Sequence, residues 1–354
     1  MAEHHRRQRT KRLVGATLAA GILTAGLCGG TPAGADPVAL PATASEAVQR
    51  MIDLSRQSEQ LNQQALDAET ELDVKLVVQR DAEAKLAAST DAVDRARDEV
   101  RRYQPVIDRT AIAAYQGART NRLFAVLVSD SPQQLLDQMS TLDVVTAQTS
   151  AQLDKYKKAT DAATAAESTA RAAADAARSA ADKADAVRSD LEKKRNDLGS
   201  AIAEVVQAWS GLSATDKSAL AGSPFPPGYD RDTLLQGLVP GSGTSALAAG
   251  LTRVGDPYVW GATGPSQFDC SGLVQWAFKQ VGKAVPRTSS QQAAYGTPVP
   301  KKDMQPGDVV FFYSDASHVG IYAGNGLMLH ASTFGVPVAV APLGSTPFHS
   351  ARRY

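Results

Sequence analysis

The chain has 354 residues, with 37 Lys and Arg against 37 Asp and Glu, so its formal net charge at pH 7 is zero. This balance argues against a nucleic-acid-binding protein, which needs a basic face. A chain of this length usually holds two or more domains, and aromatic residues make up only 6% of it, too few for ordinary globular core throughout.

The first 35 residues have the features of a secretory signal peptide. A basic start, MAEHHRRQRTKR, precedes the apolar run LVGATLAAGILTAGLCGG, and Ala33 and Ala35 supply the small residues of a cleavage site. A membrane anchor is the alternative, but the run is short for a bilayer span and rich in Gly and Ala. We therefore expect cleavage after Ala35, export to the cell envelope and no stable membrane anchor.

Cleavage would leave the protein with a single cysteine, Cys270, because the other, Cys28, lies in the leader. A single thiol cannot form an internal disulfide, and in an oxidising compartment it risks unwanted pairing. Cys270 is therefore either buried and inert or a nucleophile.

Residues 36–210 are predicted to form a coiled-coil helical domain. Apolar residues recur there at alternating spacings of three and four, with polar residues at four inner positions, one of them Ser58. Pro105 should kink or end the first helix, whereas Ser131 and Pro132 should begin the second. Two antiparallel helices in a hairpin would bury both stripes, and so would a partner chain; the sequence does not decide between them.

Residues 211–243, which include GSPFPPGYD and VPGSGT, are predicted to be a Pro/Gly-rich linker. From residue 244 to residue 354 aromatic residues and strand patterns reappear. About 110 residues of this composition can form a hydrophobic core of their own, so we expect a compact C-terminal domain.

Cys270 is predicted at the start of a helix in this domain. The stretch QFDCSGLVQWAFKQVG has apolar residues at helical spacing, Asp269 as its N-cap and Gly282 after its end. Unpaired backbone N–H groups and the positive end of the helix dipole favour a thiolate there, and they offer donors to an oxyanion. This position favours the nucleophile over the inert thiol.

Beyond the leader the only histidines are His318, His330 and His349, and the first two fall in predicted β-strands joined by the loop GNG. A three-residue loop places His318 and His330 on one face as diagonal neighbours, whereas a two-residue turn would separate them. We expect Cys270 to attack, His318 to transfer the proton and His330 to fix the tautomer of His318, with His349 structural. No motif indicates a metal or an organic cofactor.

Four stretches, GDPYVWGATGPSQFDCSGLVQWAF, VPRTSSQQ, MQPGDVVFF and SHVGIYAGNGLMLHAS, make residues 244–354 resemble the NlpC-type cysteine endopeptidases of bacterial cell walls. The resemblance implies an α+β papain-like fold, with the cysteine helix packed on a small antiparallel sheet. It also implies hydrolysis of peptidoglycan stem peptides, typically between D-glutamate and meso-diaminopimelate, by Cys270, His318 and His330.

The same resemblance implies roles for further residues. Tyr258 matches a tyrosine beside the thiol, and Asp269 and Ser271 match positions that line the peptide pocket. Arg287 and Ser290 lie in another shared block and receive no role.

The long helical region ahead of this domain resembles the Rip-type endopeptidases of mycobacteria and their relatives, which act in separating daughter cells. We expect the hairpin to dock over the active site and restrain the enzyme until a division or wall-hydrolase partner, or a protease, releases it. Two alternatives stay open: a non-catalytic division or wall scaffold, and an amidase or acyl transferase that uses the same thiol.

Overall fold

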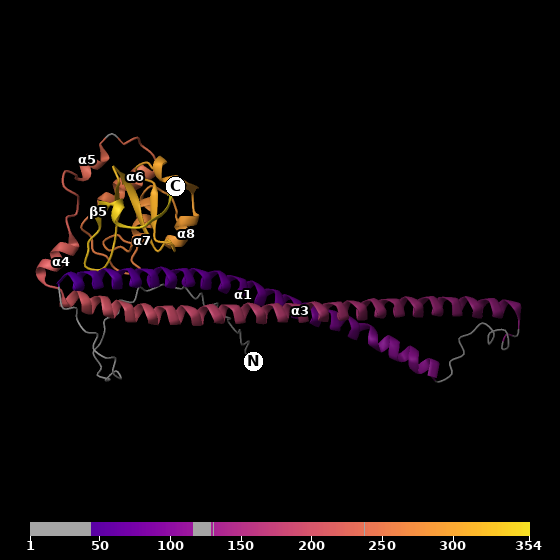
Figure 1. Cartoon of the computed structure of the whole chain (residues 1–354). Helices are drawn as coiled ribbons and strands as arrows, with labels where there is room; N and C mark the ends of the chain where they lie inside the picture. The colour runs from indigo at the N-terminus through magenta and orange to yellow at the C-terminus, as the bar shows by residue number, and fades with distance from the viewer. Residues whose placement is uncertain (1–43, 116–128, 130, 237) are drawn as a thin grey trace, which may run out of the picture. The chain divides into compact units, whose positions relative to one another are not determined.

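The structure is a computed structural model that describes residues 44–115, 129, 131–236 and 238–354 (Figure 1). The predicted signal peptide, its cleavage site and Cys28 lie outside these ranges. None of the helices within them combines the length and the hydropathy of a membrane span.

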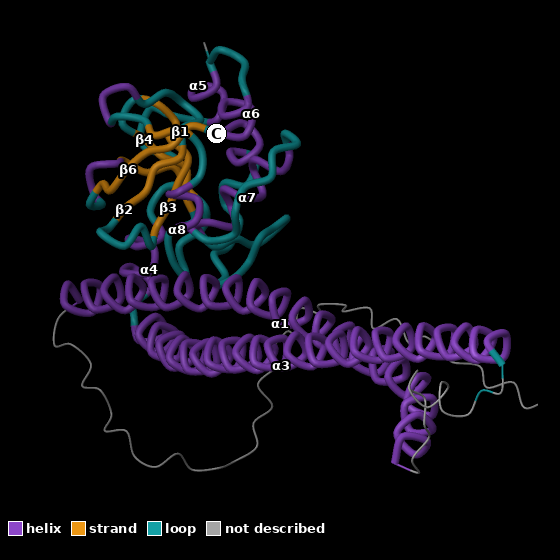
Figure 2. Tube along the Cα trace, turned by 90° about the vertical axis from the view of Figure 1, so that its right-hand side faces the viewer, coloured by secondary structure: helices purple, strands orange, loops and turns teal. Residues whose placement is uncertain are grey.

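Two long helices, α1 (Ala44–Tyr115) and α3 (Pro132–Gly211), make up the N-terminal half of the described chain. They contain 72 and 80 residues, or about 110 and 120 Å at 1.5 Å per residue. The helices run side by side (Figures 1 and 2). Ion pairs join Arg97 to Glu167 at 2.7 Å and Glu69 to Arg195 at 3.1 Å, so the directions are antiparallel. Of the two predicted arrangements, the structure has the intramolecular hairpin.

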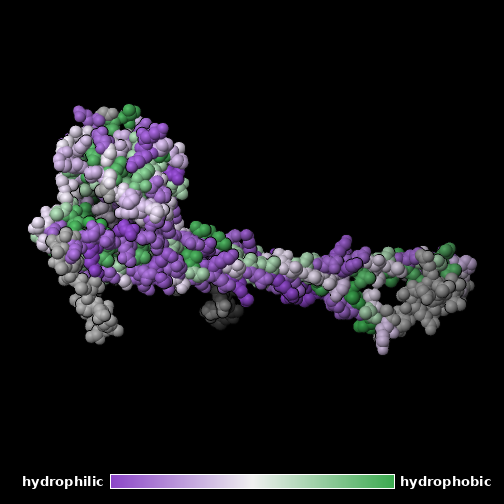
Figure 3. All heavy atoms as spheres, in the orientation of Figure 1, coloured by the Kyte–Doolittle hydropathy of each residue, from purple (hydrophilic) through white to green (hydrophobic). Residues whose placement is uncertain are grey.

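Small side chains fill much of the hairpin seam, as the heptad pattern predicts. Ala177, Ala180 and Ala184 of α3 are buried, and Ala65 and Ala68 of α1 are buried in the same way. Alanine buries little apolar area per layer, so this seam stabilises the hairpin weakly for its length. Hydrophilic side chains cover much of the hairpin face in Figure 3.

The start of α3 lies where the sequence predicts it. Ser131 caps α3, because its Oγ accepts a hydrogen bond from the backbone N–H of Gln134 at 3.2 Å, and Pro132 is the first helical residue. The first helix does not end at Pro105 but continues to Tyr115. Its last part turns away from α3 in both ribbon views.

The segment after the hairpin is more ordered than a plain linker. It holds two short helices, α4 (Ala214–Ala221) and α5 (Arg231–Leu235). Leu234 is only 4% exposed and packs in the core of the C-terminal domain. The Pro224 carbonyl accepts a hydrogen bond from the backbone N–H of Val340 at 2.9 Å. Part of this segment therefore belongs to the packing of the domain that follows it.

The C-terminal domain is α+β, as predicted, and centres on a six-stranded antiparallel sheet of order β1-β6-β2-β3-β4-β5. The strands are β1 (Thr297–Pro298), β2 (Val309–Phe312), β3 (His318–Gly324), β4 (Leu327–His330), β5 (Ala339–Pro342) and β6 (Phe348–Arg353). The helices are α6 (Ser242–Leu251), α7 (Cys270–Gln280) and α8 (Ser289–Ala294), with 3-10 turns η1 (Lys301–Asp303) and η2 (Leu343–Ser345).

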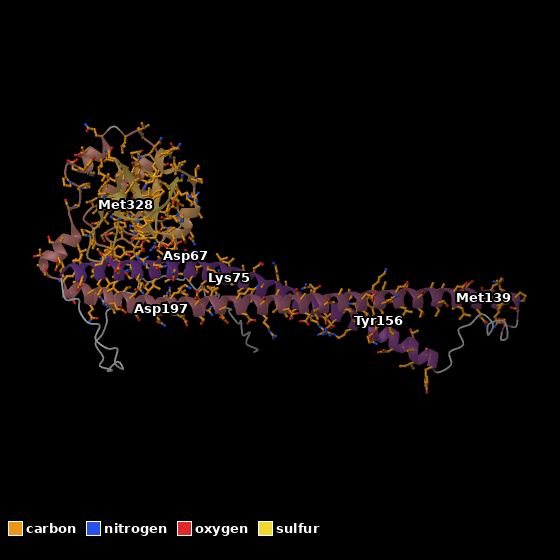
Figure 4. All side chains as sticks on the ribbon, in the orientation of Figure 1. Asp67, Lys75, Met139, Tyr156, Asp197 and Met328 are labelled. Atoms are coloured by element: carbon orange, nitrogen blue, oxygen red, sulfur yellow. The ribbon has the colours of Figure 1, made fainter. Side chains whose placement is uncertain are left out.

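Both faces of this sheet are covered, which explains the continuous apolar run VVFF in β2. Val309 and Phe311 lie in the core that also contains the buried face of α7. Val310 and Phe312 point the other way, into a second cluster around Met328 (Figure 4). Helix α7 therefore packs against one face of the sheet, where it contacts β3.

Candidate active site

Cys270 is the first residue of α7, where the sequence predicts it. Asp269 is the N-cap, and its side chain accepts a hydrogen bond from the Gly272 backbone N–H at 2.7 Å. A Cβ atom on Gly272 would lie 2.1 Å from the carbonyl oxygen of Ala262, so only glycine lets this helix start approach the preceding loop so closely. The Cys270 side chain has no exposed surface in this state.

The two histidines contact each other across neighbouring strands. His318 begins β3 and His330 ends β4, and the His318 Nε2 atom lies 2.9 Å from His330 Nδ1. Because Nε2 of His318 faces His330, Nδ1 is the nitrogen left for the thiol. The backbone of Val319, the neighbour of His318, lies near enough to Cys270 to lower the pKa of the thiol, although burial outweighs this effect. The structure therefore brings the side chains of His318 and His330 together, and it places the residue that follows His318 near the thiol.

The turn between β3 and β4 differs from the prediction. The expected three-residue loop is wrong, because Leu327 pairs with Gly324 across a turn of only two residues, Asn325 and Gly326. Both turn residues have positive φ, as in a two-residue hairpin turn. A bulge between Tyr322 and Gly324 absorbs the extra residue. The pairs Tyr322–Met328 and Ile321–Leu329 keep the predicted register, so the two histidines remain on one face.

Side chains from α1 lie directly on the thiol. The Cys270 Sγ donates a hydrogen bond to Glu59 Oε1 at 3.0 Å, and the Tyr258 hydroxyl donates one to Glu59 Oε2. The Gln63 amide Nε2 lies 3.7 Å from the same sulfur. Glu59 and Gln63 are both buried, so α1 fills the space in which a substrate carbonyl would approach the nucleophile.

The contact continues along α1 toward α8, where Asp67 lies at the edge of the C-terminal domain (Figure 4). Gln63 Oε1 accepts hydrogen bonds from the Ser289 backbone N–H at 2.9 Å and from its hydroxyl at 3.1 Å. Asn62 donates to Asp269 at 3.3 Å, and the Ser290 hydroxyl donates to Asp67 at 2.8 Å. These residues form one polar stripe on α1 that faces the catalytic groove.

Burial determines the protonation states in this arrangement. Burial, and then the neighbouring Asp269 carboxylate, raises the pKa of Glu59 to about 8. Burial, followed by Glu59 and Asp269, also raises the pKa of the Cys270 thiol well above its ordinary value. The thiolate expected from the helix start alone is therefore disfavoured here.

The histidines are neutral for a related reason. Burial, and then the neighbouring His330, lowers the pKa of His318 to about 3. Burial lowers the pKa of His330 to about 4. With thiol, carboxyl and imidazoles all uncharged near neutral pH, the site holds no thiolate–imidazolium pair in this state.

The remaining predicted site residues surround the thiol, and Arg287 acquires a role. Asp269 is fully buried and forms an ion pair with Arg287 at 2.6 Å. Arg287 also donates to the Ser271 hydroxyl at 2.8 Å. His349 is exposed on β6 and bonds Ser350. In the described ranges no group of three or more His, Cys, Asp or Glu side chains is arranged to hold a metal ion.

The chain is similar to a known protein family and to several known proteins. The model of the NlpC/P60 family matches residues 255–351. A probable endopeptidase of Mycobacterium tuberculosis is 40% identical over 373 aligned residues, which cover 96% of this chain and 94% of that protein. A probable endopeptidase of Corynebacterium glutamicum is 54% identical over 113 residues, or 32% of this chain and 54% of its own. The solved structure of NlpC2 from Trichomonas vaginalis is 38% identical with a TM-score of 0.31, covering 34% of this chain and 49% of that chain.

Proposed function

Since the chain belongs to the NlpC/P60 family of peptidoglycan hydrolases and is a cysteine-type peptidase, we propose a specific reaction and a specific control for it. The reaction is hydrolysis of peptidoglycan stem peptides between D-glutamate and meso-diaminopimelate. The protein acts after export, in remodelling the cell wall and separating daughter cells. The hairpin holds the enzyme inactive until a partner protein or a protease releases it.

The observation that carries the proposed reaction is the contact of 2.9 Å between His318 and His330, on the paired strands β3 and β4, of which β3 packs against α7. His318 takes the thiol proton, and the Cys270 sulfur bonds to the D-glutamyl side-chain carbonyl carbon. The oxyanion accepts hydrogen bonds from backbone N–H groups at the start of α7. The C–N bond then breaks, and the diaminopimelate amine leaves with the proton that His318 returns.

Hydrolysis of the thioester completes the cycle. A water molecule enters where the amine left, His318 removes its proton, and the attack releases the D-glutamyl carboxylate and the free thiol. His330 does not touch the substrate in this scheme; it holds His318 in the tautomer that presents Nδ1 to the sulfur. Tyr258, Asp269 and Ser271 surround the thiol on the side where the acyl group would lie.

The proposed control rests on what α1 does to the thiol. Cys270 has no exposed surface, and Glu59 both accepts its hydrogen bond and raises its pKa, which burial already raises. A thiol that is covered and protonated cannot attack a carbonyl. Activity then requires α1 to move away from the groove, which restores access and lets the helix start and His318 favour the thiolate.

The reaction is tested with a diaminopimelate-containing muropeptide and the full chain carrying Glu59→Ala and Gln63→Ala, called here the undocking variant. These substitutions remove the contacts to the thiol but keep a good helix former at both positions. Mass spectrometry should find cleavage after D-glutamate, and addition of Cys270→Ala should abolish it. Cleavage at another bond would point to the amidase or acyl-transferase alternative. A folded undocking variant that cleaves nothing would favour the scaffold.

A further inference from the structure

The docked helix α1 leaves one part of the catalytic groove open. Asn62, Gln63 and Asp67 fill the side toward α8. On the other side a pocket remains between α1, α4 and the C-terminal domain. The residues that define this histidine-side pocket are Ser55, Arg56, Tyr313, His318, His330 and Ser332.

Two side chains of α1, those of Ser55 and Arg56, line this pocket and are available to bind a ligand. The Ser55 side chain is buried, with 4% of its surface exposed, and its Oγ has no hydrogen-bond partner among the described residues. A buried hydroxyl without a partner costs stability, so it marks a place where a ligand atom could complete the structure. Arg56 lies with its guanidinium carbon 5.6 Å from the centre of the Tyr313 ring.

The charge of the histidine-side pocket favours an anion. Arg56 has no carboxylate within ion-pair distance in the part of the chain that the structure describes, so its charge is available. Glu59 lines the same pocket, but its raised pKa leaves it largely protonated near neutral pH. His318 and His330 are neutral there as well. A planar guanidinium with a hydroxyl one residue away suits a carboxylate, which it can bind through two parallel hydrogen bonds.

The position of this pocket also says which part of a substrate would lie in it. In the proposed reaction the acyl group stays on Cys270, and the amine departs beside His318, which lines the pocket. The leaving peptide starts with diaminopimelate, which carries a carboxylate of its own. The open side of the groove therefore matches the leaving product, while α1 fills the acyl side.

We propose that the histidine-side pocket binds the carboxylate-bearing leaving peptide and that this binding holds α1 in its docked position. This inference rests on the proposed function. Ser55 and Arg56 belong to α1, whereas Tyr313, His318 and Ser332 belong to the C-terminal domain, so the complete pocket exists only in the docked state. A ligand that binds only this state stabilises it by the factor 1 + [L]/Kd. Product accumulation would thus keep the enzyme restrained.

The test uses the full chain and meso-diaminopimelic acid as the probe, with 1,5-diaminopentane as a matched control that has the same carbon chain and amines but no carboxylates. Isothermal titration calorimetry should show saturable binding of the first compound only. Arg56→Ala and Ser55→Ala should each weaken it, Arg56→Ala by about tenfold or more, since hydrogen bonds to charged groups contribute about 1.5–3 kcal/mol. Arg80→Ala, an exposed site farther along the same helix, should leave binding unchanged.

A second readout follows α1 itself. Alkylation of Cys270 by iodoacetamide should slow as the probe saturates the wild-type chain, and this slowing should be lost in Arg56→Ala. Absence of saturable binding, equal binding by Arg56→Ala, or faster alkylation with the probe would each overturn the inference. Muropeptide cleavage by the undocking variant is measured alongside. Cleavage without probe binding would overturn only this inference, whereas binding without cleavage would overturn the proposed reaction.

Discussion

The protonation of Glu59 makes docking of α1 sensitive to pH, and this gives the sharpest prediction. Glu59 has an ordinary pKa of 4.5, which burial and then Asp269 raise to about 8 in the docked state. Between pH 4.5 and pH 8, Glu59 therefore binds one proton when α1 docks. The raised pKa stabilises docking fully below 4.5, and this contribution is lost as the pH rises toward 8.

The magnitude follows from the proton count. One proton per docking event changes the docking equilibrium by about tenfold, or about 1.4 kcal/mol, for each pH unit. The histidines and the thiol, whose pKa values are also shifted, act outside the range from pH 6.5 to pH 8. The histidines, with ordinary pKa values of 6.5 that burial lowers, act below 6.5, and the Cys270 thiol acts above its ordinary value of 9.0. From pH 6.5 to pH 8 we expect the ionisation of Glu59 to weaken docking by about 15-fold, because the docked carboxyl is already half ionised at pH 8.

The assay is the rate of Cys270 alkylation by iodoacetamide in the wild type and in Glu59→Gln, measured across this range. Glutamine can keep both contacts without a proton to lose, because its Oε1 can accept from the Cys270 thiol while its Nε2 donates to the Tyr258 hydroxyl oxygen. Dividing one rate by the other removes the intrinsic ionisation of the thiol, which both chains share. The ratio of wild type to Glu59→Gln should rise by about 15-fold between pH 6.5 and pH 8. A ratio that stays flat across this range would refute the assigned role of Glu59.

Four further substitutions test the site and the domain. In the undocking variant, His318→Ala should lower kcat/KM by about 10² to 10⁴. His330→Ala should lower kcat/KM by a smaller factor, because His330 acts through His318. An equal loss of kcat/KM in the two variants would contradict this division of roles. Leu234→Ala should lower the free energy of unfolding by about 2–5 kcal/mol in chemical denaturation, whereas exposed Leu153→Ala should change it little; equal effects would mean that Leu234 is not part of the core. Gly272→Ala should remove activity and lower the melting temperature, since its Cβ would lie 2.1 Å from a carbonyl oxygen. Gly199→Ala, which has open space around it, is the control. A fully active Gly272→Ala variant would disprove the tight contact.

Much of the catalytic domain was predictable because its signals are local. Asp269 before Cys270, followed by apolar residues at helical spacing, specifies a capped helix that starts at the thiol. The approach of His318 to His330 depends on strand register, which the hydrophobic pattern of β3 and β4 maintains even though a bulge and a two-residue turn replace the expected loop.

The contacts between α1 and the thiol could not be assigned to residues from the sequence. Glu59 and Cys270 lie 211 positions apart, and nothing local in either stretch specifies the partner. The sequence nevertheless contains one signal, because Ser58 interrupts the apolar heptad. In the structure, polar residues near Ser58 at helical spacing are buried as well. A coiled coil surrounded only by water would not bury polar residues there. Leu234 was missed for a similar reason, since its burial depends on a domain that lies after it in the chain.

The most direct test of the restrained peptidase is the initial rate of muropeptide cleavage by the full wild-type chain, the undocking variant and the Arg80→Ala control, each followed by mass spectrometry. We predict that the undocking variant is at least about tenfold faster than the wild type, since loss of buried hydrogen bonds worth about 1 kcal/mol or more each should shift docking by that much. Arg80→Ala should cleave at the wild-type rate, and addition of Cys270→Ala should abolish cleavage in each of these chains. A wild-type chain that cleaves as fast as the undocking variant would contradict the proposal that α1 holds the nucleophile inactive.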